Sequence, residues 1–239
     1  ARALLEMMDR EGIARALVSP LNSVFLKDPE EGNEELWRAV EGTGGRLLPV
    51  PCVNPVYPGW PQALERCAAL GAVGIRLYPN YHRYAVNSEP VKALASACAG
   101  RGLVLVITVR MQDERQHHPA VRVGAVKIPE IAELIRYCEG QLGVLVSFAR
   151  LPEIIAMTKL VGRERLPYCD VAGVQGPETM WNQLTGVGMS DRLLFGSGWP
   201  LQYEQVARAK VTQMAMSASF RSGVLRGNAE SLLRRSGSD

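Results

Sequence analysis

The 239-residue sequence predicts an α/β fold, namely a (β/α)8 TIM barrel whose first strand is missing from the sequence. Short apolar runs alternate with amphipathic helical segments along the whole chain, which is typical of a parallel sheet with helices packed outside it. The length suits a single barrel domain, which has about 250 residues. No Gly-x-Gly-x-x-Gly follows a predicted strand. That absence disfavours the alternative, a doubly wound open sheet with a nucleotide site.

The predicted strands are apolar runs, most of which end at small residues, Pro or Gly. They are Ala16 to Val18, Leu47 to Val53, Val73 to Leu77, Leu103 to Thr108, Val144 to Val146, Tyr168 to Val171 and Leu193 to Phe195. The run from Leu103 to Thr108 is continuously apolar and rich in β-branched residues, which predicts burial on both faces. The last run ends in Gly196-Ser197-Gly198, and such small residues allow a ligand or another backbone to approach closely.

The predicted helices lie between these strands. They cover Leu4 to Met8, Leu36 to Val40, Pro61 to Ala68, Val91 to Ala99, Pro129 to Cys138, a segment from Pro152, Met180 to Leu184, Val206 to Met216 and Ala229 to Arg234. Because the chain starts on a helix, we expect residues 1–239 to form one TIM-barrel domain that lacks its N-terminal strand.

Composition narrows the functional classes. Hydrophobic residues make up 47% of the chain and the net charge is +3, so a sizeable core is expected and no polyanionic partner is indicated. No apolar stretch is long enough to span a membrane. The five cysteines are odd in number and form no Cys-x-x-Cys, which indicates buried thiols in a reducing compartment and favours the cytoplasm.

The loop after the predicted strand Leu103 to Thr108 carries the densest group of chemically useful side chains. Active sites of TIM barrels lie at the carboxyl ends of the strands, so this loop would border the active site. Arg110 and Arg115 are candidates to bind a substrate carboxylate. Asp113 is a candidate to orient His117 or His118, with His118 as general base. The alternative is an ordinary solvated loop.

Four further candidates lie at or near strand ends. Arg76 alternates with Ile75 and Leu77, so its charge points to the barrel axis, where it either anchors a substrate or forms a structural salt bridge. Tyr78, two residues after Arg76, is a candidate to contact the substrate, with packing of the loop as the alternative. Asp170 interrupts an apolar strand and either enters the pocket or caps the next loop. Trp199 lies beside the mouth and either stacks on a planar substrate or covers the rim.

Several segments together resemble the amidohydrolase-related family of TIM-barrel hydrolases and decarboxylases. They are Gly12 to Val18, Pro51-Cys52-Val53-Asn54-Pro55, Gly74-Ile75-Arg76-Leu77-Tyr78-Pro79, Asp191 to Ser197 and Gly227-Asn228-Ala229, and they occur in the family's order. The resemblance implies a metal-dependent hydrolase fold that binds a small-molecule substrate, often as a homodimer.

The family's metal-binding residues are replaced in this sequence. The family's histidine after the fifth barrel strand corresponds to about Ile107, its His-x-Gly to Ser147-Phe148-Ala149, and its catalytic Asp to Gly198. A divalent cation needs about three or more convergent ligands, so we expect no metal and no other cofactor. A relocated site of Asp113, His118 and Asp170 is the alternative.

Two functions follow from this resemblance. The first is a hydrolase that acts without the usual metal on a small carboxylate-bearing lactone or similar ring. The second is a catalytically inactive relative that serves as a ligand-binding or assembly subunit. Turnover of a lactone panel would distinguish them.

Overall fold

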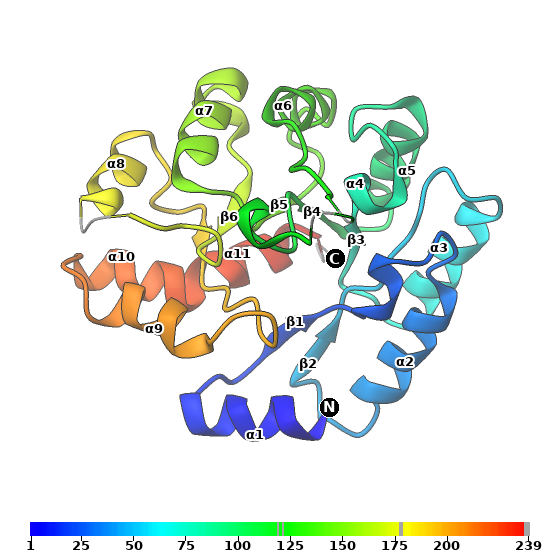
Figure 1. The fold of residues 1–239 in the computed structure, drawn as a ribbon, viewed down its shortest axis with the longest axis horizontal. Helices are drawn as coiled ribbons and strands as arrows, with labels where there is room; N and C mark the ends of the chain where they lie inside the picture. The colour runs from blue at the N-terminus through cyan, green and yellow to red at the C-terminus, as the bar shows by residue number, and fades with distance from the viewer. Residues whose placement is uncertain (119, 121, 177–178, 237–239) are drawn as a thin grey trace.

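The computed structural model describes residues 1–118, 120, 122–176 and 179–236. Its strands are all parallel and form a two-stranded sheet, β1-β2, and a five-stranded sheet, β3-β4-β5-β6-β7. They are β1 (Ala16–Val18), β2 (Leu47–Pro49), β3 (Gly74–Leu77), β4 (Val104–Thr108), β5 (Val144–Ser147), β6 (Tyr168–Asp170) and β7 (Leu193–Leu194). Because sheet order repeats chain order, the strands form a curved wall with helices around it (Figure 1).

Helices connect successive strands and surround the wall. They are α1 (Arg2–Glu11), α2 (Glu30–Val40), α3 (Trp60–Ala69), α4 (Pro79–His82), α5 (Glu89–Ala99), α6 (Ile128–Tyr137), α7 (Leu151–Val161), α8 (Met180–Gly186), α9 (Glu204–Thr212), α10 (Ala218–Ser222) and α11 (Asn228–Ser236). Short helical turns are η1 (Asn22–Val24), η2 (Glu114–Gln116), η3 (Arg163–Arg165) and the π-helical η4 (Gly223–Gly227). The α/β fold predicted from the alternating pattern is confirmed.

Backbone contacts join the two sheets between β2 and β3. The Val73 N–H donates to the Pro49 carbonyl at 3.0 Å, and the Arg76 N–H donates to the Pro51 carbonyl at 2.8 Å. Cys52 also forms an isolated parallel bridge with Arg76. Within the described ranges no ladder joins β7 to β1, so the wall is continuous from β1 to β7 and is not closed between them. An additional first strand therefore stays a prediction.

Side chains on the two faces of the wall pack into different clusters. Outward residues such as Leu105, Ile107 and Val146 pack with the helices. Inward residues form a second apolar layer of Val50, Val104, Val106, Leu145, Tyr168 and Leu194, to which α11 adds Leu232. Every residue of β4 is buried, which confirms the predicted burial on both faces. Because α11 lies behind the strands in Figure 1, its leucine closes the end opposite the loops that follow the strands.

Helices α1 and α9 meet across the unpaired edges of β1 and β7. Arg10 Nη2 lies 2.5 Å from Glu204 Oε1, and Arg208 Nη1 lies 2.7 Å from Glu11 Oε2. Trp199 packs against the cluster formed by Met7 and Met8 of α1 and Leu47 of β2. The segment after β7 is thus fixed to the N-terminal helix.

Some element boundaries differ from the prediction. The strand predicted over Leu47 to Val53 ends at Pro49, since proline has no N–H to donate to a ladder. The helix predicted over Val206 to Met216 is α9, which ends at Thr212, because the Ser217 hydroxyl accepts the Phe220 N–H at 3.2 Å and starts α10. Among the described helices none is long and apolar enough to cross a membrane. All five cysteines are free, and Cys138 alone of them is not fully buried.

Candidate functional site

Polar side chains line the inner face of the wall where four consecutive strands end. Arg76, Thr108, Ser147 and Asp170 come from β3, β4, β5 and β6. They continue the same inward-facing rows as the apolar layer below them, because successive residues of a strand alternate between its faces. We call these four residues the mouth cluster. Figure 1 looks onto this end of the wall, with η2 and α4 in front of the strands.

Asp170 is the buried acidic member of the mouth cluster. Its carboxylate accepts the Ser147 hydroxyl, the Phe148 N–H at 3.2 Å and the Ala172 N–H at 3.1 Å. Burial raises the pKa of Asp170, while the bonds from Ser147 and Phe148 and the charge of Arg76 oppose that rise. A carboxyl group with a raised pKa accepts a proton more readily near neutral pH. Of the two roles considered for Asp170, the Ala172 N–H bond shows that it caps the following loop, and a role in substrate binding stays a prediction.

The glycine after β7 makes room for this carboxylate. A Cβ atom on Gly196 would lie 2.7 Å from the Asp170 Cβ, which is closer than real Cβ contacts. The small residues at this strand end predicted close approach of a ligand or another backbone, but the neighbour of Gly196 is the side chain of Asp170 from β6.

Arg76 is the basic member of the mouth cluster, and it has no ion-pair partner in the described part of the chain. Its Nη1 donates weakly to Thr108 Oγ1 at 3.4 Å, and its buried Nε has no hydrogen-bond partner among described atoms. It also interacts with the hydroxyl of Tyr78, whose pKa burial raises to about 12. The structural salt bridge considered for Arg76 is thus not formed. An uncommitted buried N–H donor is costly unless a ligand accepts from it.

The loop after β4 is tied to α7 by an ion network. Arg110 is buried and binds both carboxylate oxygens of Glu153, and its Nη1 also donates to the Phe148 carbonyl at 2.9 Å. Arg150 Nη2 lies 3.1 Å from Glu114 Oε2. Arg110 was predicted to bind substrate, but its guanidinium is already satisfied within the protein.

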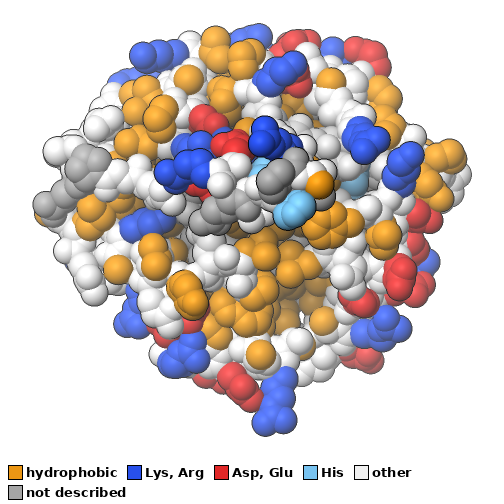
Figure 2. Space-filling model, viewed as in Figure 1, with side chains coloured by type: hydrophobic (Ala, Val, Ile, Leu, Met, Phe, Trp, Pro, Cys, Tyr) orange, Lys and Arg blue, Asp and Glu red, His pale blue; other side chains and the backbone are white. Residues whose placement is uncertain are grey.

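The other predicted residues of this loop lie at its surface. Asp113 caps η2 by accepting the Arg115 N–H at 3.0 Å and also pairs with the Arg115 guanidinium at 2.7 Å. His118 is exposed, and its Nδ1 accepts the Ala120 N–H at 3.1 Å. No hydrogen bond joins Asp113 to a histidine within the described ranges. Figure 2 shows acidic, basic and histidine side chains gathered over η2 and hydrophobic side chains below them, over β1 and β2.

Gly198 and Trp199 are the residues after β7 that the sequence analysis singled out. Gly198 has φ +67°, and a Cβ there would lie 2.8 Å from the Phe148 ring. Phe148 itself has φ +60°, a conformation that costs energy for a bulky residue. It is held by its N–H bond to Asp170 and its carbonyl bond from Arg110. Trp199 packs against α1 and β2 and so covers the rim.

The mouth cluster does not fit a divalent cation. Its single carboxylate already accepts hydrogen bonds from three donors. Its other groups are two hydroxyls and a guanidinium cation that would repel a metal ion. The Phe148 ring fills the space beside Gly198. Among the described residues no three His, Cys, Asp or Glu side chains come together as a metal site, which also removes the relocated site of Asp113, His118 and Asp170.

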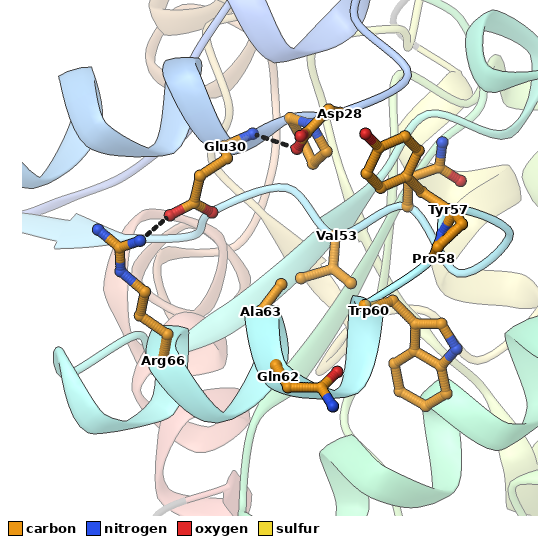
Figure 3. Close-up of a pocket in the computed structure, with 12 residues that line it drawn as sticks. Asp28, Glu30, Val53, Tyr57, Pro58, Trp60, Gln62, Ala63 and Arg66 are labelled. Atoms are coloured by element: carbon orange, nitrogen blue, oxygen red, sulfur yellow. Dashed lines mark hydrogen bonds and ion pairs between the residues drawn. The ribbon is translucent and has the colours of Figure 1, made fainter.

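A separate pocket of about 270 Å³ lies on the loops after β1 and β2. Figure 3 shows Tyr57 and Trp60 on one side of it and the ion pair of Glu30 with Arg66, 2.5 Å apart, on the other. Asp28 accepts the Glu30 N–H at 3.1 Å. Because its charged groups are already engaged and no residue of the mouth cluster lines it, the mouth remains the candidate functional site.

Sequence reasoning missed Thr108 as a partner of Arg76, Glu153 as the partner of Arg110, and Lys210, which is described below. Thr108 could have been found from strand alternation, since it shares a face with Val104 and Val106. Glu153 and Lys210 lie on helices far along the chain, and their residue types gave no signal.

Comparisons with known proteins agree on the fold. The sequence model described as "Amidohydrolase" matches residues 2–235. Similar solved structures include an uncharacterized TIM-barrel protein from Bordetella bronchiseptica, with 16% identity over 98% of this chain and 82% of that chain and a TM-score of 0.75. No protein of curated function matches the sequence.

Other similar structures carry enzyme names. A probable 2-pyrone-4,6-dicarboxylic acid hydrolase from Acinetobacter baumannii has 14% identity over 97% of this chain and 88% of its own, with a TM-score of 0.70. A dihydroxybenzoic acid decarboxylase from Polaromonas sp. JS666, with bound manganese, has 16% identity over 97% of this chain and 85% of its own, with a TM-score of 0.73. At these identities the likeness shows a shared fold.

Proposed function

Because the chain belongs to the amidohydrolase family whose model matches residues 2–235, we propose that it is a hydrolase whose mouth cluster binds a small ring substrate through a carboxylate. The observation that carries this proposal is Arg76, a half-buried strand arginine whose buried Nε has no hydrogen-bond partner and which forms no ion pair within the described chain. A substrate carboxylate would satisfy that donor and accept two parallel N–H bonds from one guanidinium.

The charges around the mouth support an anionic substrate. Asp170 is the buried anion there, and two cations interact with it electrostatically, Arg76 and Lys210 of α9. Arg110 is neutralised by Glu153. Arg76 and Lys210 together therefore carry one positive charge more than Asp170 balances, and partial burial strengthens the attraction of such a charge for a carboxylate.

The proposed reaction is hydrolysis of a lactone with Asp170 as general base. Asp170 removes a proton from a water molecule as the water oxygen bonds to the lactone carbonyl carbon. The ring C–O bond then breaks, and the leaving oxygen takes the proton back from Asp170, so that the product is a ring-opened hydroxy acid. The Ser147 and Phe148 bonds hold one orientation of the carboxylate. No metal takes part in this proposal, since the described donors at the mouth do not fit one.

The predicted catalytic roles of Asp113 and His118 remain predictions. Asp113 is engaged by Arg115 and His118 lies exposed on the loop, so Asp170 is the stronger candidate for the base. Asp113→Asn and His118→Ala, assayed beside Asp170→Asn, would separate the two assignments. We expect a loss of turnover of about 100-fold or more only for Asp170→Asn.

The function is tested by a substrate panel with matched arginine variants. The panel contains 2-pyrone-4,6-dicarboxylate, its methyl esters, simple lactones and dihydroxybenzoates. We expect hydrolysis of the ring lactone that carries a free carboxylate, unchanged by chelator. Arg76→Met should raise KM by about 10- to 100-fold, as expected for losing a charged hydrogen bond of about 1.5–3 kcal/mol. Arg101→Met, which loses an exposed pair with Glu65 and a hydrogen bond to the Ala97 carbonyl far from the mouth, is the control.

The other outcomes of this panel are equally informative. Equal KM values for Arg76→Met and the native protein would refute carboxylate anchoring. Binding of the dicarboxylate by calorimetry without any turnover would instead favour the inactive, ligand-binding relative. Loss of activity with chelator would show that a metal supports the reaction.

A further inference from the structure

A lysine from outside the wall reaches the turn that follows the proposed base. Lys210 belongs to α9, and its side chain is partly buried. Its Nζ donates to the Val171 carbonyl at 3.1 Å and to the Ala172 carbonyl at 3.4 Å. These two residues directly follow Asp170 at the end of β6. An ammonium group that bonds two successive carbonyls fixes the path of that turn.

The turn that Lys210 holds also holds the Asp170 carboxylate. The Ala172 N–H donates to Asp170 Oδ1 at 3.1 Å, and the Val171 N–H donates to the Leu194 carbonyl at 3.0 Å. The turn therefore has one anchor on β7 and one on α9. If the α9 anchor were lost, the Ala172 N–H would be free to move away from the carboxylate.

Lys210 also acts on Asp170 through its charge. Burial lowers the pKa of Lys210, and the neighbouring Asp170 opposes that change. The other groups that face Asp170 are Arg76 from β3, Ser147 from β5 and the neutral Cys169 of its own strand, while Gly196, after β7, adds no charge. Lys210 is thus the second cation beside the carboxylate, and it reaches the mouth from a helix rather than from a strand.

We propose that Lys210 is a positioning residue for Asp170, which fixes the turn at Val171 and Ala172 and places a positive charge near the Asp170 carboxylate from outside the wall. The proposal rests on the proposed function only in giving Asp170 a role as base. Neither bond of Lys210 occupies the carboxylate itself, because both go to backbone carbonyls of the turn.

The experiment titrates Asp170 without substrate, so its outcome does not depend on whether the proposed reaction is correct. The side-chain carboxyl carbons of aspartate are followed by NMR from pH 3 to pH 9, and the Asp170 signal is assigned with Asp170→Asn. Lys210→Gln keeps a hydrogen-bond donor and removes the charge. We expect it to raise the pKa of Asp170, Lys210→Arg to restore the native value, and Lys159→Gln on the exposed face of α7 to leave it unchanged.

A reciprocal titration keeps the proposal testable if Lys210→Gln does not fold. Because the coupling between two sites is mutual, Asp170→Asn should lower the pKa of Lys210 in an otherwise native protein. The Nζ or Cε resonance of Lys210 reports it. Hydrogen exchange of the Ala172 amide should also be faster in Lys210→Gln than in Lys210→Arg. An unchanged Asp170 pKa in folded Lys210→Gln, or an unchanged Lys210 pKa in Asp170→Asn, would overturn the proposal.

Discussion

At the scale of single residues, the site depends on small side chains as much as on charged ones. Gly196 leaves space for the Asp170 side chain, and Gly198 leaves space for the Phe148 ring. The sequence predicted close approach at both glycines from their position after a strand. It could not predict which groups approach, because Asp170 lies at the end of β6 and Phe148 directly follows β5.

Gly196→Ala should damage the site without unfolding the protein. The added methyl would lie 2.7 Å from the Asp170 Cβ, so Asp170 must move away from Ser147 and Phe148. We expect at least a tenfold loss of turnover and a stability loss of about 1–3 kcal/mol, measured by steady-state kinetics and urea unfolding. Gly186→Ala, where no atom lies within 4 Å of the added carbon, is the control. Native activity in Gly196→Ala would contradict the geometry described for Asp170.

Asp170→Asn should abolish turnover and stabilise the fold at neutral pH. The raised pKa of Asp170 in the folded protein means that the folded state binds this proton more tightly than the unfolded state. Stability from this group is therefore present at low pH and falls as the pH rises through its folded pKa. The Asn variant has no carboxyl to ionise, so it does not lose this stability. Its free energy of unfolding in urea should therefore exceed that of the native protein at pH 7, and the difference should vanish near pH 3. An advantage of equal size at both pH values would show that ionisation of Asp170 is not its cause.

At the scale of elements, helix α7 organises the loop that borders the mouth. Glu153 lies in its first turn, accepts the Arg150 N–H at 2.7 Å and binds Arg110. The sequence indicated that this loop was rich in both charges but not that Arg110 was already paired. That pairing depends on a glutamate 43 residues away, and single-sequence patterns carry no information on such contacts.

Glu153→Gln should loosen this loop. Burial acts to raise the pKa of Glu153, but the bonds from Arg110 and Arg150 outweigh it, and the pKa is lowered below its ordinary 4.5. The ionised Glu153 therefore contributes its full stability above pH 4.5, and this contribution is lost as the pH falls through the lowered pKa of the folded protein. We expect a loss of about 2 kcal/mol at pH 7 that disappears in acid, and faster hydrogen exchange at Arg115.

Glu130→Gln is a control of similar exposure, since Glu130 pairs with the exposed Lys127. Its stability should change by less than about 0.5 kcal/mol. If the two glutamine variants behaved alike, the ion network would not be what holds the loop.

At the scale of the whole molecule, the two ends of the wall differ in polarity. Polar residues lie at the carboxyl ends of the strands, while an apolar layer closed by Leu232 fills the opposite end. This division followed from the sequence, because parallel alternation predicted a barrel and barrels place their chemistry at one end. Closure by α11 could not be predicted, since a short amphipathic helix at a chain end gives no sign of where it packs.

Leu232→Ala should lower stability and leave the mouth unaffected. Leu232 is fully buried, and removing such a side chain costs about 2–5 kcal/mol. We expect a single cooperative thermal transition, as predicted for one domain, at a lower Tm than in the native protein. At temperatures below that Tm, the KM for the panel substrate should be unchanged. Leu225→Ala, at a position that is 45% exposed, should change Tm little. Two transitions would contradict the single-domain prediction.

The separation of these two layers has an evolutionary consequence. The four residues of the mouth cluster stand on strands whose packing partners lie elsewhere, among the helices and in the layer below. A lineage with this wall can therefore exchange a ligand-binding side chain at the mouth by point mutation and keep its melting behaviour almost intact. Selection for a new substrate then acts on a few strand-end codons, while selection for folding acts on others.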